Sequence, residues 1–245
     1  MMATQPKTTF AQQSVWGAGF QDFSGSDSPV VFVKLRIEGA NKTIFEGCVP
    51  TFGHSITTAS GGKHHCDGTN NHTPVKLGPT CTTALNDASK IHRFDFDATF
   101  SPDYDDYFIT SIGGDKGTTT QAWSLILNYQ QTTKGGCQTK VSKGDEILWA
   151  FDAYHKTHFL KLEAPSIVKA GTTILLTVTD GKNKDVCVQG ATVTRSDGST
   201  GTVVGTSDKN GTVSVHFPDS GVFSFKASKD DSIRSNSAII FVTDA

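Results

Sequence analysis

Alternation of apolar and polar residues marks the first strand of this chain. Val31, Val33, Leu35 and Ile37 alternate with the charged residues Lys34, Arg36 and Glu38, which is the period of a half-buried strand. The Gly39-Ala40-Asn41-Lys42 segment predicts a turn, so we expect residues 43–49 to return as the second strand of a hairpin. Further strands are predicted over residues 94–100, 123–129 and 147–151.

One segment has the period of a helix instead. Over residues 82–91, Leu85, Ala88 and Ile91 fall on one face, and Thr82 or Thr83 can cap the start. Residues 50–80 are rich in Gly, His, Asn, Thr and Pro and predict a long loop. The order of hairpin, helix and further strands predicts an α+β domain over residues 29–163, with one helix packed on a mixed sheet.

The composition changes near Ala164-Pro165. Beyond this point aromatic residues become rare, and turn pairs such as Asp180-Gly181 separate short β-type runs. We therefore expect a second, all-β domain over residues 164–245, an immunoglobulin-like β-sandwich without an intersheet disulfide. Its strands are predicted at 174–178, 191–194, 202–204, 212–217, 222–227 and 238–242.

Residues 1–28 lack a periodic core face and read as an amino-terminal arm. Its large apolar groups are Trp16, Phe20 and Phe23. The arm has no assigned role.

Composition and charge narrow the classes of partner. The chain has 245 residues, 36% of them hydrophobic, and Lys and Arg total 22 against 24 Asp and Glu. A net charge of -2 gives no electrostatic basis for binding a phosphate backbone, so nucleic acid is not an expected partner. No apolar run approaches the roughly 18 residues of a membrane-spanning helix, so no membrane partner is expected. The oligomeric state is left open.

Cysteines and glycosylation acceptors predict a secreted glycoprotein. Asn41, Asn71 and Asn210 each begin an Asn-x-Thr acceptor. The first residues lack the apolar run of a secretory leader, so we expect a leader that is not part of this sequence. Two disulfides and one free thiol are the simplest use of five cysteines, and 15 pairings are open. The disulfide candidates are Cys48, Cys66, Cys81, Cys137 and Cys187.

Residues 30–162 resemble the transcobalamin-C-like, β-grasp family of the domain-of-unknown-function 4430 type. The resemblance rests on the hairpin over 31–49, on Trp123-Ser-Leu-Ile-Leu-Asn128 and on residues 143–149. Residues 61–70 and 135–138 look like the fungal branch of that family, and the tail resembles bacterial-type immunoglobulin-like modules. The resemblance implies a β-grasp fold. The vitamin carriers of the family hold cobalamin between two domains, and this sequence shows no counterpart of their large helical domain.

Motifs of common reactions are absent from the sequence. There is no Gly-x-Ser-x-Gly, His-Glu-x-x-His, Cys-x-x-Cys or Gly-rich phosphate loop. The densest group of metal-type ligands is His64, His65, Cys66, Asp67 and His72. Adjacent histidines of an extended chain point to opposite sides, and Cys66 is expected to be oxidised, so a structural loop is favoured. We expect no metal and no cofactor.

Three further aspartates and two histidines are candidate sites. Asp103, Asp105 and Asp106 carry carboxylates suited to calcium, but no Gly turn or distal Glu completes a loop, which favours the solvated start of a strand. His155 and His158 could act as acid or base near neutral pH, yet no partner residue can be assigned, which favours ordinary surface positions.

The leading functional hypothesis is a secreted protein that binds a mostly apolar or glycosidic small molecule in an aromatic-lined cleft of the β-grasp domain. Alternation places some aromatic rings on the sheet face opposite the helix, and the border with the sandwich domain is one location for the cleft. The candidate ligand-binding residues are Tyr107, Trp123, Tyr129, Trp149, Phe151, Tyr154 and His158.

Two other functions fit the same sequence. A concerted cycloaddition needs positioning rather than acid or base, so a cofactor-independent fungal hetero-Diels-Alderase of tropolonic sesquiterpene biosynthesis is one alternative. A cell-wall or adhesion protein with both domains as spacers is the other. Catalytic residues cannot be assigned from the sequence, which leaves catalysis open.

Overall fold

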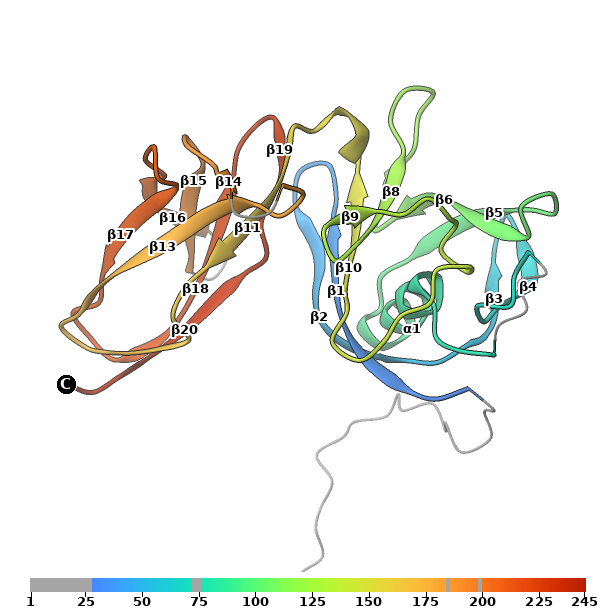
Figure 1. The fold of residues 1–245 in the computed structure, drawn as a ribbon, viewed down its shortest axis with the longest axis horizontal. Coiled ribbons are helices and arrows are strands. Elements are labelled where there is room, and N and C mark those ends of the chain that lie inside the picture. Colours follow the sequence, from blue (N-terminus) through green and yellow to red (C-terminus); the bar gives the residue numbers. More distant parts are fainter. Residues whose placement is uncertain (1–27, 72–75, 184–185, 198–199) are drawn as a thin grey trace, which may run out of the picture.

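The fold is mostly β-sheet. The computed structural model describes residues 28–71, 76–183, 186–197 and 200–245, so the predicted arm lies outside the described residues except for Ser28. Within these ranges there are several sheets and a single α-helix, and no helix combines the length and apolar character needed to span a bilayer. We divide the chain into an amino-terminal part, residues 28–156, and a carboxy-terminal part, residues 157–245 (Figure 1).

The largest sheet of the amino-terminal part is mixed. Its strand order is β2-β1-β10-β8-β9, with β1 antiparallel to β2 and parallel to β10. The predicted hairpin is confirmed, because β1 and β2 pair from Val31–Thr51 to Glu38–Thr43. The strands are β1 (Val31–Glu38), β2 (Thr43–Thr51), β8 (Trp123–Leu127), β9 (Gln130–Gln131) and β10 (Glu146–Phe151).

Helix α1 (Cys81–His92) begins one residue before the predicted start. Its N-cap is Thr80, which accepts a hydrogen bond from the Thr83 backbone, while the Thr83 side chain bonds back to the N-cap backbone. The prediction of Thr82 or Thr83 as the cap was therefore wrong, because this reciprocal capping box fixes the start at Thr80. Leu85 and Ala88 are buried as expected, but Ile91 is exposed.

Residues 50–80, predicted as a loop, contain an antiparallel hairpin of β3 (His54–Thr58) and β4 (Gly62–Cys66). This prediction was wrong because the segment lacks strand periodicity and is held by a distant residue. The Tyr107 hydroxyl accepts from the His64 amide at 3.1 Å and lies 2.9 Å from the Gly62 carbonyl oxygen. Tyr107 belongs to a neighbouring sheet of β5 (Phe96–Ser101), β6 (Asp106–Ile112) and β7 (Asp115–Lys116).

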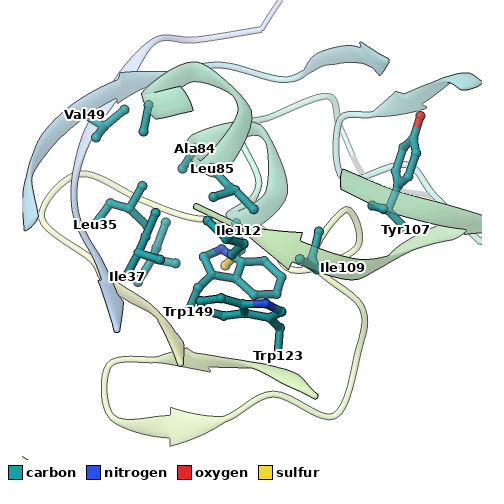
Figure 2. Packing of buried hydrophobic residues seen from close by; sticks show 14 of the residues in the cluster. Leu35, Ile37, Val49, Ala84, Leu85, Tyr107, Ile109, Ile112, Trp123 and Trp149 are labelled. Carbon is teal, nitrogen blue, oxygen red and sulfur yellow. The ribbon is translucent and has the colours of Figure 1, made fainter. Parts of the chain in front are cut away.

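The core of the amino-terminal part lies between α1 and the mixed sheet. Leu35 and Ile37 of β1 meet Leu85 of the helix, and Trp123 and Trp149 fill the space beside them (Figure 2). All five side chains are buried. The side chains of β1 that point away from this core lie on the other face of the sheet, because neighbouring residues of a strand alternate.

The carboxy-terminal part consists of two five-stranded sheets around a core of its own. One sheet has the order β14-β13-β11-β19, with β17 also paired to β13, and the other has the order β12-β20-β18-β15-β16. All six predicted strands form. The strands are β11 (His158–Glu163), β12 (Ile167–Lys169), β13 (Thr173–Asp180), β14 (Val186–Cys187), β15 (Thr192–Asp197), β16 (Thr200–Thr206), β17 (Thr212–His216), β18 (Gly221–Ser228), β19 (Ser232–Ile233) and β20 (Ala238–Thr243).

A third cluster of buried apolar residues joins the two parts. Leu148 and Ala150 of the mixed sheet pack in it with Phe159 and Ile233 of the carboxy-terminal part. The 3-10 helix η1 (Ala153–His155) leads from β10 to β11 and buries Ala153 in the same cluster. Apolar burial at this junction opposes separation of the two parts.

Candidate functional site

A groove of about 470 Å³ lies where the two parts meet, and we call it the central groove. Its floor is the face of the mixed sheet that points away from helix α1, and its other wall comes from β11, β18 and β20. The residues around it are Lys34, Leu35, Arg36, Glu46, Gly47, Cys48, Tyr129, Glu146, Ile147, Leu148, Lys161, Ser224, Asn236, Ser237 and Ile239.

The walls of the central groove are closed at one end and diverge toward the other. Along the outer face of β1, Phe32 is 53% exposed, and the side-chain exposure is 68% for Lys34, 8% for Arg36 and 1% for Glu38. The carboxy-terminal part therefore covers the Glu38 end of the strand and leaves the Phe32 end open.

Ionic contacts fix the closed end. Glu38 accepts a hydrogen bond from Arg234 Nε at 2.8 Å and forms an ion pair with Lys226 Nζ, also at 2.8 Å. The Arg36 guanidinium lies 3.7 Å from the same carboxylate and donates to the carbonyl oxygen of Arg234. Because charge-assisted bonds of a buried carboxylate are strong, these contacts hold the two parts at a set angle.

Glu46 makes a second ionic link beside the first. It accepts from Lys226 Nζ at 2.9 Å and from the Ser237 amide and hydroxyl at 2.7 and 2.8 Å. Burial alone would raise the pKa of Glu46, but Lys226 and the bonds to Ser237 outweigh it and lower the pKa. Glu46 is therefore ionised at neutral pH and contributes a fixed negative charge to the floor.

Tyr129 is the aromatic residue of the groove. Its hydroxyl donates to Asn236 Oδ1 at 3.3 Å, and the Arg36 guanidinium lies 5.8 Å from its ring centre. Burial raises the pKa of Tyr129 to about 12, so the phenol stays neutral. Asn236 is itself held by the Leu162 amide and carbonyl, each at 3.0 Å.

The open end carries paired charges and a free thiol. Lys34 Nζ contacts Glu146 Oε1 at 2.8 Å, and Lys161 Nζ contacts Glu163 Oε1 at 2.6 Å. Cys48 lies beside Lys34 on the neighbouring strand, and its thiol is exposed. The groove thus offers hydroxyl, amide and apolar groups together with charges that already have partners.

The structure does not bring the seven predicted ligand-binding residues together. Tyr107, Trp123, Trp149 and Phe151 are buried in the amino-terminal core, where they fill space between the helix and the sheets. Tyr129 alone of the seven lies in the central groove. Edges of Tyr107, Trp123 and Trp149 touch a shallower hollow of about 280 Å³ between β6 and β8.

The last two predicted residues, Tyr154 and His158, lie on the segment that connects the two parts. Tyr154 is 83% exposed on η1. His158 Nδ1 lies 3.1 Å from Asp180 Oδ2, and Asp180 also accepts from the Phe159 and Lys182 amides. Burial alone would raise the pKa of Asp180. The hydrogen bonds outweigh burial and lower the pKa, and the bond from His158 has the largest lowering effect. His158 therefore closes a structural contact rather than facing the central groove.

Sequence reasoning missed the polar residues of the groove. Alternation places Lys34 and Arg36 on the outer face of β1, which is the one signal that could have singled them out. Lys34 pairs with Glu146 of β10, and Arg36 donates to the carbonyl oxygen of Arg234, which is far away in the sequence. Nothing local to β1 indicates that a second sheet covers this face.

A second hollow, of about 820 Å³, lies on the other side of the junction and is mostly polar. It is bordered by the β1–β2 turn, by Phe151 and by the segment 228–234. Asn41, a predicted glycosylation site, is exposed at its rim. The other acceptors, Asn71 and Asn210, are also exposed.

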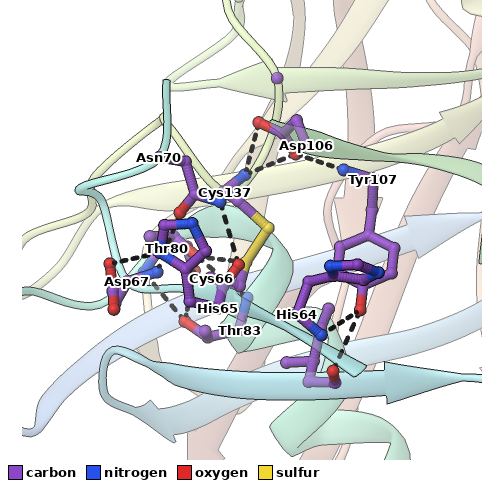
Figure 3. The surroundings of a disulfide bond; sticks show 12 residues. His64, His65, Cys66, Asp67, Asn70, Thr80, Thr83, Asp106, Tyr107 and Cys137 are labelled. Carbon is purple, nitrogen blue, oxygen red and sulfur yellow. Dashed lines mark hydrogen bonds and ion pairs between the residues drawn. A yellow bond between two sulfur atoms is a disulfide. The ribbon is translucent and has the colours of Figure 1, made fainter. Parts of the chain in front are cut away.

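One disulfide, Cys66–Cys137, joins β4 to the segment before β10 (Figure 3). The expectation that Cys66 is oxidised is confirmed. The expected count of two disulfides was wrong, because the other cysteines lie on separate elements: Cys48 is exposed on β2, Cys81 is buried in α1, and Cys187 is exposed on β14. Burial raises the pKa of the Cys81 thiol, which keeps it protonated and unreactive.

The histidines before the disulfide have structural partners. The His64 ring stacks on Phe100 with centroids 3.5 Å apart, and His65 Nε2 contacts Asp105 at 3.1 Å. Within the described ranges, no group of three or more His, Cys, Asp or Glu side chains could hold a metal ion. His72 lies outside those ranges.

Asp106 differs from the predicted solvated position. It is buried at the start of β6 and accepts from the amides of Tyr107, Cys137 and Gln138 at 2.7 to 3.2 Å (Figure 3). Burial outweighs these bonds and raises the pKa of Asp106 to about 6. The carboxyl ties β6 to the disulfide segment, which is a contact that the sequence could not indicate.

Comparison with known proteins adds a family match over part of the chain. Residues 78–153 match a family model described as a domain of unknown function, DUF4430. A crystal structure of haptocorrin in complex with Cbi is similar to 50% of this chain, with 14% sequence identity and a TM-score of 0.34. The chain spans 25% of the length of that haptocorrin chain. No curated protein matches the sequence.

Proposed function

We propose that this protein binds a mostly apolar or glycosidic small molecule in the central groove. The observation that carries the proposal is the groove itself: a hollow of about 470 Å³ between the mixed sheet and the carboxy-terminal part, with Tyr129 hydrogen-bonded to Asn236 across it. Binding sites for small molecules commonly have volumes of roughly 300–1,000 Å³ and combine apolar walls with a few fixed polar groups.

Preorganisation supports the proposal. The ionic links of Glu38 and Glu46 hold both walls before a ligand arrives. A site whose walls are already ordered loses less conformational entropy when it binds, which increases affinity for a given set of contacts. The shallower hollow beside Trp123 is a weaker candidate, since most of its aromatic area is already buried in the core.

The proposed organisation is a β-grasp domain followed by an immunoglobulin-like β-sandwich. Because β11 pairs with β13 and β19, we place the domain boundary at residues 156–157 rather than near residue 164. Secretion is part of the proposal and is supported by the Cys66–Cys137 disulfide, which persists in oxidising compartments. Exposed Asn41, Asn71 and Asn210 are then accessible glycosylation sites.

Fluorescence of N-phenyl-1-naphthylamine, an uncharged apolar probe, tests the site. We expect the intact chain to enhance its emission and Ser224→Trp, which places an indole in the groove, to abolish most of the enhancement. Ser214→Trp adds the same group at an exposed position on β17 and is the matched control. Equal enhancement by both variants, or none by the intact chain, would contradict the proposal.

A further inference from the structure

We propose that the ligand of the central groove is an uncharged amphiphile, with its hydroxyl-bearing end at the closed end and its apolar end along the diverging walls. This inference rests on the proposed function and specifies its ligand class. Three features of the groove support it: paired charges, neutral polar groups at the closed end and a continuous apolar wall at the open end.

Each of these charged side chains of the groove already has a polar partner. Lys34 pairs with Glu146 at 2.8 Å and Glu46 with Lys226 at 2.9 Å, while the Arg36 guanidinium donates to a backbone carbonyl and lies near Glu38. A ligand carboxylate attracted by Lys34 is repelled by Glu146 at almost the same distance. An ionic headgroup would therefore lose its hydration without gaining an unopposed partner.

Neutral hydrogen-bonding groups gather at the closed end. The Tyr129 hydroxyl donates to Asn236, which leaves its oxygen lone pairs able to accept. Ser237 adds a hydroxyl group there beside Glu46, while Ser224 adds one farther along the groove, opposite Ile239. These groups can exchange hydrogen bonds with the hydroxyls of an alcohol or a sugar without moving an ion pair.

An apolar path leads out of the open end. Ile239 lines the groove and is 52% exposed, and Phe241, two residues later on the same face of β20, has the same exposure. Phe241 pairs directly with Ile167 on one side and with Val222 on the other, so these three exposed side chains form a row across β12, β20 and β18. The row spans two strand spacings, about 10 Å.

The outer face of β1 also carries an exposed apolar residue, Phe32. It lies next to the open end and is 53% exposed. An apolar chain that leaves the groove along β20 would thus contact Ile239 and then Phe241. Burying such surface contributes about 25 cal/mol per Å² of apolar area, so affinity should rise with chain length.

The rate at which iodoacetamide alkylates Cys48 measures how far a probe occupies the groove. The Cys48 thiol lines the groove and is exposed, so a bound probe should protect it. Cys187 is exposed on β14, away from the groove, and serves as the internal control in the same molecule. The probes share a ten-carbon chain: decyl glucoside, decanoate and decyltrimethylammonium, each used below the concentration at which it forms micelles. We expect the glucoside to protect Cys48 at a concentration at least about tenfold below either ion.

Two substitutions sharpen the test. Phe241→Ser should raise the protective glucoside concentration several-fold, whereas Leu175→Ser, an equally exposed change on the other sheet, should leave it unaltered. Glu146→Gln should shift preference toward decanoate, because it removes the charge that opposes a carboxylate at Lys34.

The outcomes separate the two proposals. Protection by decanoate or by the ammonium at the glucoside's concentration, or an unchanged preference in Glu146→Gln, overturns the uncharged-ligand inference and leaves the groove as a binding site. If no probe protects Cys48 and the naphthylamine also gives no groove-dependent signal, the proposed function itself fails.

Discussion

Arg234 Nε donates a hydrogen bond of 2.8 Å to Glu38 Oε2 across the junction of the two parts. The residues are 196 positions apart in the sequence, and the Glu38 side chain is almost completely buried. The contact fixes the closed end of the central groove. Its removal would leave cationic groups without their partner in a partly dehydrated site.

Glu38→Gln is therefore expected to destabilise the protein. Breaking a buried pair typically costs about 3–5 kcal/mol, and because Arg234 and Lys226 remain partly accessible to water we expect about 2–3 kcal/mol. Urea unfolding at pH 7 measures the change. Glu163→Gln, at an exposed pair with Lys161, should cost less than about 0.5 kcal/mol. Equal losses for the two variants would show that the junction does not depend on Glu38.

Removal of the disulfide by Cys66→Ser with Cys137→Ser should lower stability by roughly 4 kcal/mol. The bridge closes a separation of 71 residues, and its loss frees the unfolded chain. Unfolding followed by circular dichroism gives the difference. Cys48→Ser removes an exposed free thiol and should change stability little. A double variant as stable as Cys48→Ser would mean that the bridge does not limit the unfolded ensemble.

Asp106 predicts a pH dependence of opposite sign to that of an ordinary salt-bridged aspartate. Its pKa is raised from 3.8 to about 6 in the folded protein, so between these values the folded state binds more protons than the unfolded state. The contribution of Asp106 to stability therefore falls as the pH rises from about 4 to about 6, by about 2–3 kcal/mol.

Asp106→Asn isolates this effect from other titrating groups. The difference in unfolding free energy between the intact chain and the variant should change across pH 4 to 6 and be constant above pH 7. Its amide also presents hydrogens to backbone N–H donors, so the variant should be less stable than the protonated parent by about 1–3 kcal/mol. A pH-independent difference would show that the folded pKa of Asp106 is ordinary.

Gly181→Ala should disturb the groove by displacing the ring of Tyr129. A Cβ atom at Gly181 would overlap the ring of Tyr129, so the ring must move. We expect about 1–3 kcal/mol of destabilisation and weaker enhancement of naphthylamine fluorescence. Gly117→Ala meets its nearest neighbour at 3.4 Å and is the control. Unaltered probe binding in Gly181→Ala would show that Tyr129 does not shape the site.

Local periodicity determined much of the secondary structure. The hairpin of β1 and β2, the helix near Leu85 and the strands of the carboxy-terminal part follow from patterns within short windows, because a strand or helix repeats its buried face every two or every 3.6 residues. The cap at Thr80 and the hairpin of β3 and β4 did not follow, since a backbone capping pattern and the distant Tyr107 decide them.

The candidate site depended on tertiary structure far more than the fold did. From the sequence, Trp123 and Trp149 could line a cleft or fill a core, and packing against the helix made them core. Alternation along β1 already put Lys34 and Arg36 on the outer face of the sheet. Only the position of the carboxy-terminal part decided that Glu38 is buried and that Phe32 is exposed. The sequence of a strand sets which way a side chain points but not what covers it.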